Sequence, residues 1–140
     1  MDSILTALKQ HDLKMGVAHQ WRTAAPGRQT IRDVKAEKYG KLLRIRVRPK
    51  DDNRGGGEDL WVLGTHVFDL TNHLAGYPLW CQGYARQNGE LVTAKHVKPG
   101  NEGIGLLAGD NVGATYALPN EVLAHFRSIH RGAGLSLIHI

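Results

Sequence analysis

The dipeptide Asn88-Gly89 is the feature that most constrains how this chain folds. Both residues readily adopt a positive φ, so Asn-Gly between two runs of strand-forming residues is the strongest short-range signal for a two-residue β-hairpin turn. The flanking residues 80–87 and 90–97 would then pair in antiparallel fashion, with Cys81 opposite His96 and Arg86 opposite Leu91. The sequence thus predicts a β-hairpin here and indicates antiparallel sheet structure.

A second hairpin is predicted from residues 29–37 and 42–48, with Tyr39-Gly40 as its turn. In this register Val34 lies opposite Ile45, and Lys35 lies opposite Arg44. One face is then almost entirely apolar and the other almost entirely charged, as a half-buried antiparallel pair requires.

The remaining segments extend this pattern. Helical spacing predicts a short helix over residues 3–11 and a C-terminal helix that begins at Pro119. Strands are predicted at residues 17–22, 60–68 and 114–118. We therefore predict an α+β fold, a mainly antiparallel β meander forming a small, partly open barrel or bent sheet, with a helix near each end.

The length of 140 residues corresponds to one domain, which we assign to residues 1–134. The last six residues, 135–140, follow a Gly-Ala-Gly spacer and resemble the translation of a sequencing adapter. We expect them to be a non-native tail. The N-terminus lacks the pattern of a signal peptide and no apolar run is long enough to span a membrane, so the expected location is cytoplasmic.

Cysteine and histidine usage restricts the chemistry. The single cysteine, Cys81, excludes an internal disulfide and a zinc site built on paired cysteines. No histidines show close metal-ligand spacing on one face, so no metal and no cofactor is predicted. The predicted hairpin would place Cys81 opposite His96, near enough for a nucleophile and base, although a free cysteine among small residues is usually a core residue.

The charge of the chain is strongly lopsided. Residues 1–54 hold thirteen Lys and Arg against six acidic residues, whereas residues 55–140 hold five against seven. A basic half of this kind is typical of a polyanion-binding face, and also of an ordinary solvated surface.

Basic and aromatic side chains share the exposed faces of the two predicted hairpins. Phosphates need cations and bases stack on aromatic rings, so this combination is typical of single-stranded nucleic-acid binding. The predicted nucleic-acid-binding residues are Lys35, Arg44, Arg46, Arg48, Trp80, Tyr84, Arg86 and Lys95. In the alternative interpretation Trp80 and Tyr84 are buried in the core, and the exposed faces then carry basic side chains alone.

The predicted function is therefore nucleic-acid binding without catalysis. Two alternatives remain open at this point. The first is a protein-binding inhibitor or assembly module, whose sheet and glycine-rich loops contact a protein partner. The second is a hydrolase or transferase that uses Cys81 and His96.

Overall fold

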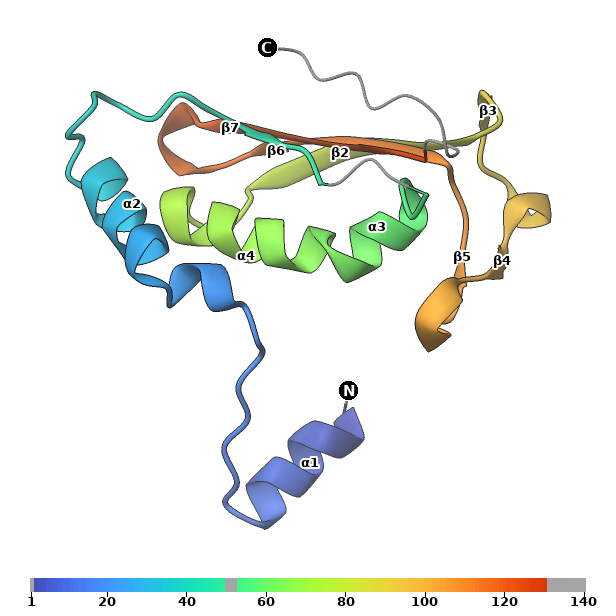
Figure 1. Ribbon diagram of the computed structural model, residues 1–140, viewed down its shortest axis with the longest axis horizontal. Helices are drawn as coiled ribbons and strands as arrows, with labels where there is room; N and C mark the ends of the chain where they lie inside the picture. Colours follow the sequence, from blue (N-terminus) through green and yellow to red (C-terminus); the bar gives the residue numbers. More distant parts are fainter. Residues whose placement is uncertain (1, 50–52, 131–140) are drawn as a thin grey trace.

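The protein is an α+β fold in which helices cover one face of a mixed five-stranded sheet (Figure 1). The computed structural model describes residues 2–49 and 53–130. The predicted tail at residues 135–140 lies outside them. None of the described helices is long and apolar enough to cross a membrane.

The five-stranded sheet has the order β1-β7-β6-β2-β3, and a separate two-stranded ribbon joins β4 and β5. Strands β1 and β7 are parallel, whereas the pairs β7–β6, β6–β2 and β2–β3 are antiparallel. The strands are β1 (Arg44–Val47), β2 (Trp80–Gln87), β3 (Glu90–Leu91), β4 (Lys98–Pro99), β5 (Leu106–Leu107), β6 (Asn111–Ala117) and β7 (Leu123–Ile129). The sheet does not close into a barrel, which agrees with the partly open form that the sequence predicts.

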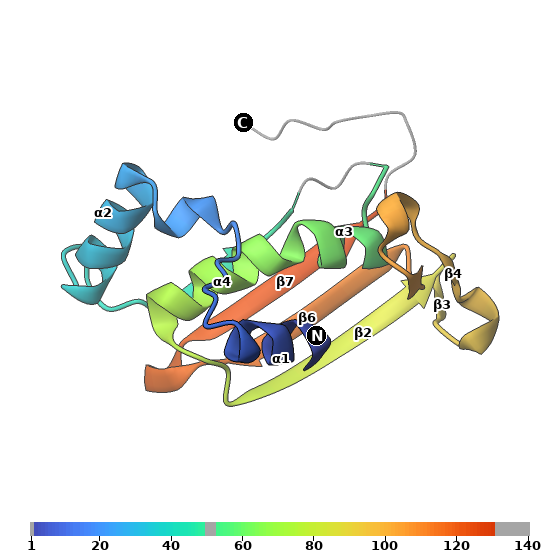
Figure 2. The ribbon, with the colours of Figure 1, turned by 90° about the horizontal axis from the view of Figure 1, so that it is seen from below.

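Four α-helices and four short 3₁₀ helices connect and cover these strands in the described part of the chain. Helices α3 and α4 lie beneath the sheet, α2 lies beside the end of α4, and α1 stands away from the rest (Figures 1 and 2). The helices are α1 (Asp2–Gln10), η1 (Gln20–Arg22), α2 (Ala25–Lys35), α3 (Gly57–Val62), α4 (Gly64–Ala75), η2 (Ala94–His96), η3 (Asn101–Gly103) and η4 (Pro119–Glu121).

The core lies between α4 and the sheet face that α4 covers. Phe68 of α4 packs against Phe126 of β7, with ring centroids 5.1 Å apart. Leu118, Val122 and Ala124 form the buried cluster, against which Ile45 of β1 also packs. These contacts show which face of each strand is internal, because side chains alternate between the two faces of a sheet.

A buried polar network ties the α3 end of the helical layer to β7. The side chains of Asp59 and Ser128 are 1% and 0% exposed. The Ser128 hydroxyl donates to Asp59 Oδ2 at 2.6 Å and accepts a hydrogen bond from the backbone N–H of Gly56 at 2.9 Å. A Cβ at Gly55 would lie 2.0 Å from the carbonyl oxygen of Ile129, so the glycine run lets this loop approach β7 closely.

Several local predictions are confirmed. The N-terminal helix forms as α1, and residues 114–117 of the predicted strand at 114–118 belong to β6. Asn88 and Gly89 both have positive φ, and the predicted pair Arg86 with Leu91 is present.

The remainder of that hairpin is wrong. Only two residues of β3 pair with β2, after which Thr93 and His96 form a capping box that turns the chain into η2. Strand β2 pairs instead with β6 along its first seven residues, from Trp80 to Arg86. A long strand with complementary small and aromatic residues therefore displaces the local partner.

The predicted hairpin of residues 29–48 is also wrong. Residues 25–35 form α2, because Pro26 suits a first helical turn and Gly27, Ile31 and Val34 recur at helical spacing. A Cβ at Gly27 would lie 1.8 Å from the carbonyl oxygen of Trp21, so this glycine lets η1 touch the helix. Strand β1 pairs with β7 instead.

Four further predictions are corrected. The segment 60–68 is helical in α3 and α4, because a short run that is apolar on all sides fits a helix as well as a buried strand. The predicted C-terminal helix is η4 followed by β7, since Ala124, Phe126 and Ser128 are buried with period two. Residues 17–22 form no strand, and the last three of them form η1. The meander order fails because β7 inserts between β1 and β6.

Candidate nucleic-acid interface

The sheet face opposite α4, here called the outer face, is covered by none of the described helices (Figure 1). Strand alternation assigns side chains to it, because Ala124 and Phe126 are buried on the other side. The outer face carries Arg44 and Arg46 of β1, His125 and Arg127 of β7, Thr115 of β6, and Trp80, Gln82, Tyr84 and Arg86 of β2.

The strand pairings arrange these side chains in rows across the sheet. The first row runs from Arg44 through Leu123 and Ala117 to Trp80. The second runs from Arg46 through His125 and Thr115 to Gln82. The third runs from Arg127 through Gly113 to Tyr84. Each row thus has an arginine toward the β1 edge and an aromatic or amide side chain on β2.

The charged side chains on the outer face of the described strands are all arginines. Four arginines occupy outer-face positions of the described strands, and no aspartate or glutamate does. Glu90 pairs with Gln87 and therefore points to the opposite face. Within the described residues Arg44, Arg46 and Arg127 make no hydrogen bond or ion pair.

The two aromatic side chains on β2 are exposed. The side chain of Trp80 is 52% exposed and that of Tyr84 is 44% exposed. The Tyr84 ring lies across Gly113, where a Cβ would be only 2.7 Å from ring atoms Cε1 and Cζ. The absence of a side chain at Gly113 therefore lets the ring lie close to the sheet.

The structure gathers five of the eight predicted binding residues on the outer face: Arg44, Arg46, Trp80, Tyr84 and Arg86. Arg48 follows the end of β1 and is exposed. Lys35 lies at the end of α2 and Lys95 lies in η2, so neither belongs to the outer face. Trp80 and Tyr84 are not core residues.

Sequence reasoning missed Gln82, Thr115, His125 and Arg127. The last two were assigned to a helix, although residues 124–128 alternate between apolar or small side chains and polar ones. That period-two pattern was the available signal: Ala124, Phe126 and Ser128 are internal, whereas His125 and Arg127 are external.

Cys81 and His96 are not brought together. Cys81 lies opposite Tyr116 of β6, on the face away from the outer face. His96 Nδ1 instead accepts a hydrogen bond from the backbone N–H of Thr93 at 2.9 Å. Burial, followed by the adjacent Cys81, raises the pKa of Tyr116 to about 12, which keeps the phenol neutral. The predicted pair of nucleophile and base is therefore absent.

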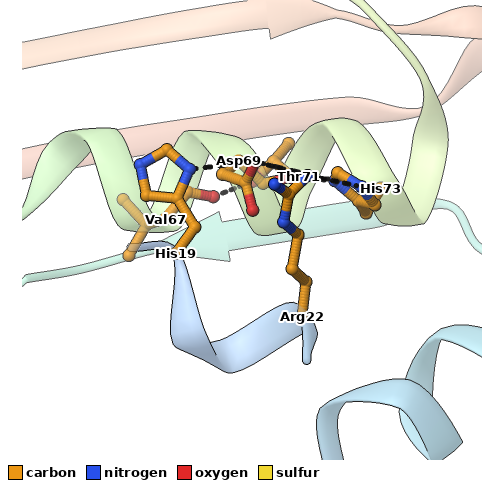
Figure 3. A network of polar contacts seen from close by, with 6 residues as sticks. All are labelled: His19, Arg22, Val67, Asp69, Thr71 and His73. Carbon is orange, nitrogen blue, oxygen red and sulfur yellow. Dashed lines mark hydrogen bonds and ion pairs between the residues drawn. The ribbon is translucent and has the colours of Figure 1, made fainter. Parts of the chain in front are cut away.

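A second polar cluster joins the segment around η1 to α4 (Figure 3). Asp69 Oδ1 lies 3.1 Å from His19 Nδ1 and 3.6 Å from Arg22 Nη1. Arg22 Nη1 also lies 3.3 Å from His73 Nε2. Because an arginine side chain can only donate, His73 Nε2 accepts this hydrogen bond. The other ring nitrogen of His73, Nδ1, then carries the proton and donates to the Asp69 carbonyl oxygen at 2.8 Å.

The contacts of this cluster are satisfied within the protein. The Asp69 side chain is only 14% exposed, and its carboxylate faces the η1 segment. Among the described residues no group of three or more His, Cys, Asp or Glu side chains is arranged to hold a metal ion. The cluster serves to fix the N-terminal segment on α4.

No model of a known protein family matches this chain, and a search of curated proteins gives no match either.

Proposed function

We propose that the chain binds single-stranded nucleic acid on the outer face of its sheet. The observation that carries this proposal is the juxtaposition, on one face, of exposed aromatic rings and arginines that have no ion pair among the described residues, while no carboxylate occupies this face of the described strands. Such a face neutralises phosphates by charge and accepts bases by stacking, which are the two requirements of single-strand binding.

The positions of these groups suggest a path for the strand. Trp80 and Tyr84 both lie on β2, whereas Arg44, Arg46 and Arg127 lie on β1 and β7 at the other side of β6. A nucleic-acid strand that runs parallel to β2 would stack its bases on the aromatic rings and direct its phosphates toward β7 and β1. A flat, open sheet suits a single strand because the bases are not paired and their faces are accessible.

Removing two of the arginines tests the proposal. Binding that neutralises phosphates weakens with salt, and the slope of log affinity against log salt falls by about 0.7 for each lost contact to a single strand. The double variant Arg44→Gln, Arg46→Gln should therefore lower the slope by about 1.4. The slope is measured by fluorescence anisotropy of a labelled single-stranded oligonucleotide across a series of salt concentrations.

The chain provides a charge-matched control. Lys35→Gln, Lys95→Gln removes the same net charge but from α2 and η2, away from the outer face. We expect a clearly smaller change of slope in this variant. A folded Arg44→Gln, Arg46→Gln protein that binds with the wild-type slope would contradict the proposal.

Gly113 offers a test of the stacking surface. In Gly113→Ala the new Cβ would meet the Tyr84 ring at 2.7 Å, so the ring must move away from the sheet. The contact is with the far end of a flexible side chain, and the protein should still fold. We expect loss of part of one base stack, about 1 kcal/mol or a fivefold weaker affinity, with the salt slope unchanged. The same anisotropy titration measures both quantities, and an unchanged affinity would show that Tyr84 does not stack a base.

A protein-binding assembly module is the second candidate. It is favoured by the apolar side chains that the N-terminal segment exposes, since Ile4, Leu5 and Trp21 are 48%, 48% and 60% exposed. Clusters of exposed apolar residues are typical of protein–protein contacts. Salt-independent retention of a protein partner by residues 2–21, without affinity for oligonucleotides, would favour this alternative.

A further inference from the structure

The middle row of the outer face differs chemically from the rows on either side. It carries the hydrogen-bonding side chains of Gln82, Thr115 and His125. The neighbouring rows have Ala117 and Leu123 on one side and Gly113 on the other at the central strands. A polar strip is thus enclosed between two rows whose β2 residues, Trp80 and Tyr84, are aromatic.

The spacing of the rows leaves room for one nucleotide between the two aromatic rings. Trp80 and Tyr84 are four residues apart on a strand, which corresponds to about 13 Å. The rise per nucleotide in a stacked strand is about 3.4 Å, and an extended strand covers roughly twice that distance. Bases on Trp80 and Tyr84 would therefore be separated by a single base, which lies over the middle row.

The hydrogen-bonding groups of the middle row are available from two sides. Gln82 and His125 lie on either side of Thr115, two strand spacings or about 10 Å apart at the backbone. Within the described residues the Gln82 amide has no hydrogen-bond partner. His125 Nδ1 lies 3.1 Å from Thr115 Oγ1, which leaves the ring nitrogen Nε2 for another contact.

A purine presents hydrogen-bonding atoms along two adjacent edges of its larger ring system, so it can reach both of these groups. Adenine and guanine carry hydrogen-bonding groups on the Watson–Crick edge and an N7 acceptor on the Hoogsteen edge. The polar atoms of a pyrimidine are concentrated on one edge of a smaller ring. A base held between Gln82 and His125 can therefore satisfy both side chains when it is a purine.

We propose that the middle row makes the interface selective for a purine at one nucleotide, which lies between two stacked bases. Gln82 binds one edge of this purine and His125 binds the adjacent edge, with Thr115 holding the imidazole. This inference rests on the proposed function, because it assigns the specificity of the same face.

The test compares thymidine hexamers that are uniform or carry one adenine, guanine or cytosine at a central position. Affinities of the full chain are measured by fluorescence anisotropy at one salt concentration. A pair of base-edge hydrogen bonds discriminates by about tenfold, so the adenine or guanine hexamer should bind about tenfold more tightly than the other two.

Variants then assign the preference to residues. Gln82→Leu removes the amide at similar size and should reduce the purine preference, the ratio of purine hexamer to thymidine hexamer affinity, to about twofold or less. His125→Leu should act in the same direction. Gln10→Leu, which makes the same change on the exposed helix α1, is the matched control and should retain the full preference.

The outcomes separate this inference from the proposed function. Equal affinity for all four hexamers, together with salt-dependent binding, would overturn purine selection and leave single-strand binding intact. A purine preference that persists in both Gln82→Leu and His125→Leu would overturn the assignment to the middle row. Absence of binding to every hexamer would overturn both proposals.

Discussion

Replacing Ser128 with alanine should lower the free energy of unfolding by about 2–4 kcal/mol. The Ser128 hydroxyl is fully buried, donates to the carboxylate of Asp59 and accepts from the N–H of Gly56. Removing it leaves a buried carboxylate oxygen and a backbone N–H without this partner, and each carries a desolvation penalty. The loss is measured by urea denaturation.

A control variant separates this network from a general effect of losing a hydroxyl. Thr65 is exposed on α4, so Thr65→Ala should change the free energy of unfolding by about 0.5 kcal/mol or less. A loss in Ser128→Ala that is no larger than this value would contradict the role of the Asp59–Ser128–Gly56 network. The network connects the 55–59 loop to β7, the strand that carries His125 and Arg127 of the outer face.

The double variant Trp80→Ala, Tyr84→Ala should weaken the binding of a single-stranded oligonucleotide at least thirtyfold. Each lost base stack costs about 1–3 kcal/mol, so two stacks amount to about 2–6 kcal/mol. Stacking involves no counterion release, and the salt slope should therefore change little. Affinity and slope are both measured by anisotropy over a salt series.

Stability must be recorded beside affinity for this variant. Both rings are about half exposed, so their removal should lower the melting temperature only slightly. Trp61→Ala is the control, because Trp61 is 61% exposed but belongs to α3, in the helical layer. A loss of affinity in Trp61→Ala as large as the loss in the double variant Trp80→Ala, Tyr84→Ala would contradict stacking on the outer face.

The side chains of the outer face were predictable in part from the alternation of residues along single strands. Arg44 and Arg46 alternate with Ile45 and Val47. This alternation places the two arginines on one face of β1 and the two apolar residues on the other, whichever strand is the partner. The arginines were therefore assigned correctly to an exposed face, although the predicted hairpin does not exist. In the same way Trp80, Tyr84 and Arg86 share one face of β2 whether the strand pairs with β3 or with β6.

The sequence by itself determined the features that depend on neighbouring residues. The Asn88-Gly89 turn forms because both residues accept a positive φ, and α1 forms because its apolar residues recur at helical spacing. The two faces of β1 and β2 follow from strand geometry alone.

Only the tertiary structure decided which segments meet. Residues 123–129 have a helical stripe as well as a period-two pattern, and pairing along the whole of β6 makes them a strand. Residues 60–68 are apolar on all sides, and packing beneath the sheet makes them helical. The insertion of β7 between β1 and β6 also brings Arg127 and His125 into the rows of the outer face. Such long-range pairings depend on the burial of whole sheet faces. A short segment of the sequence does not determine which distant segment will bury its face.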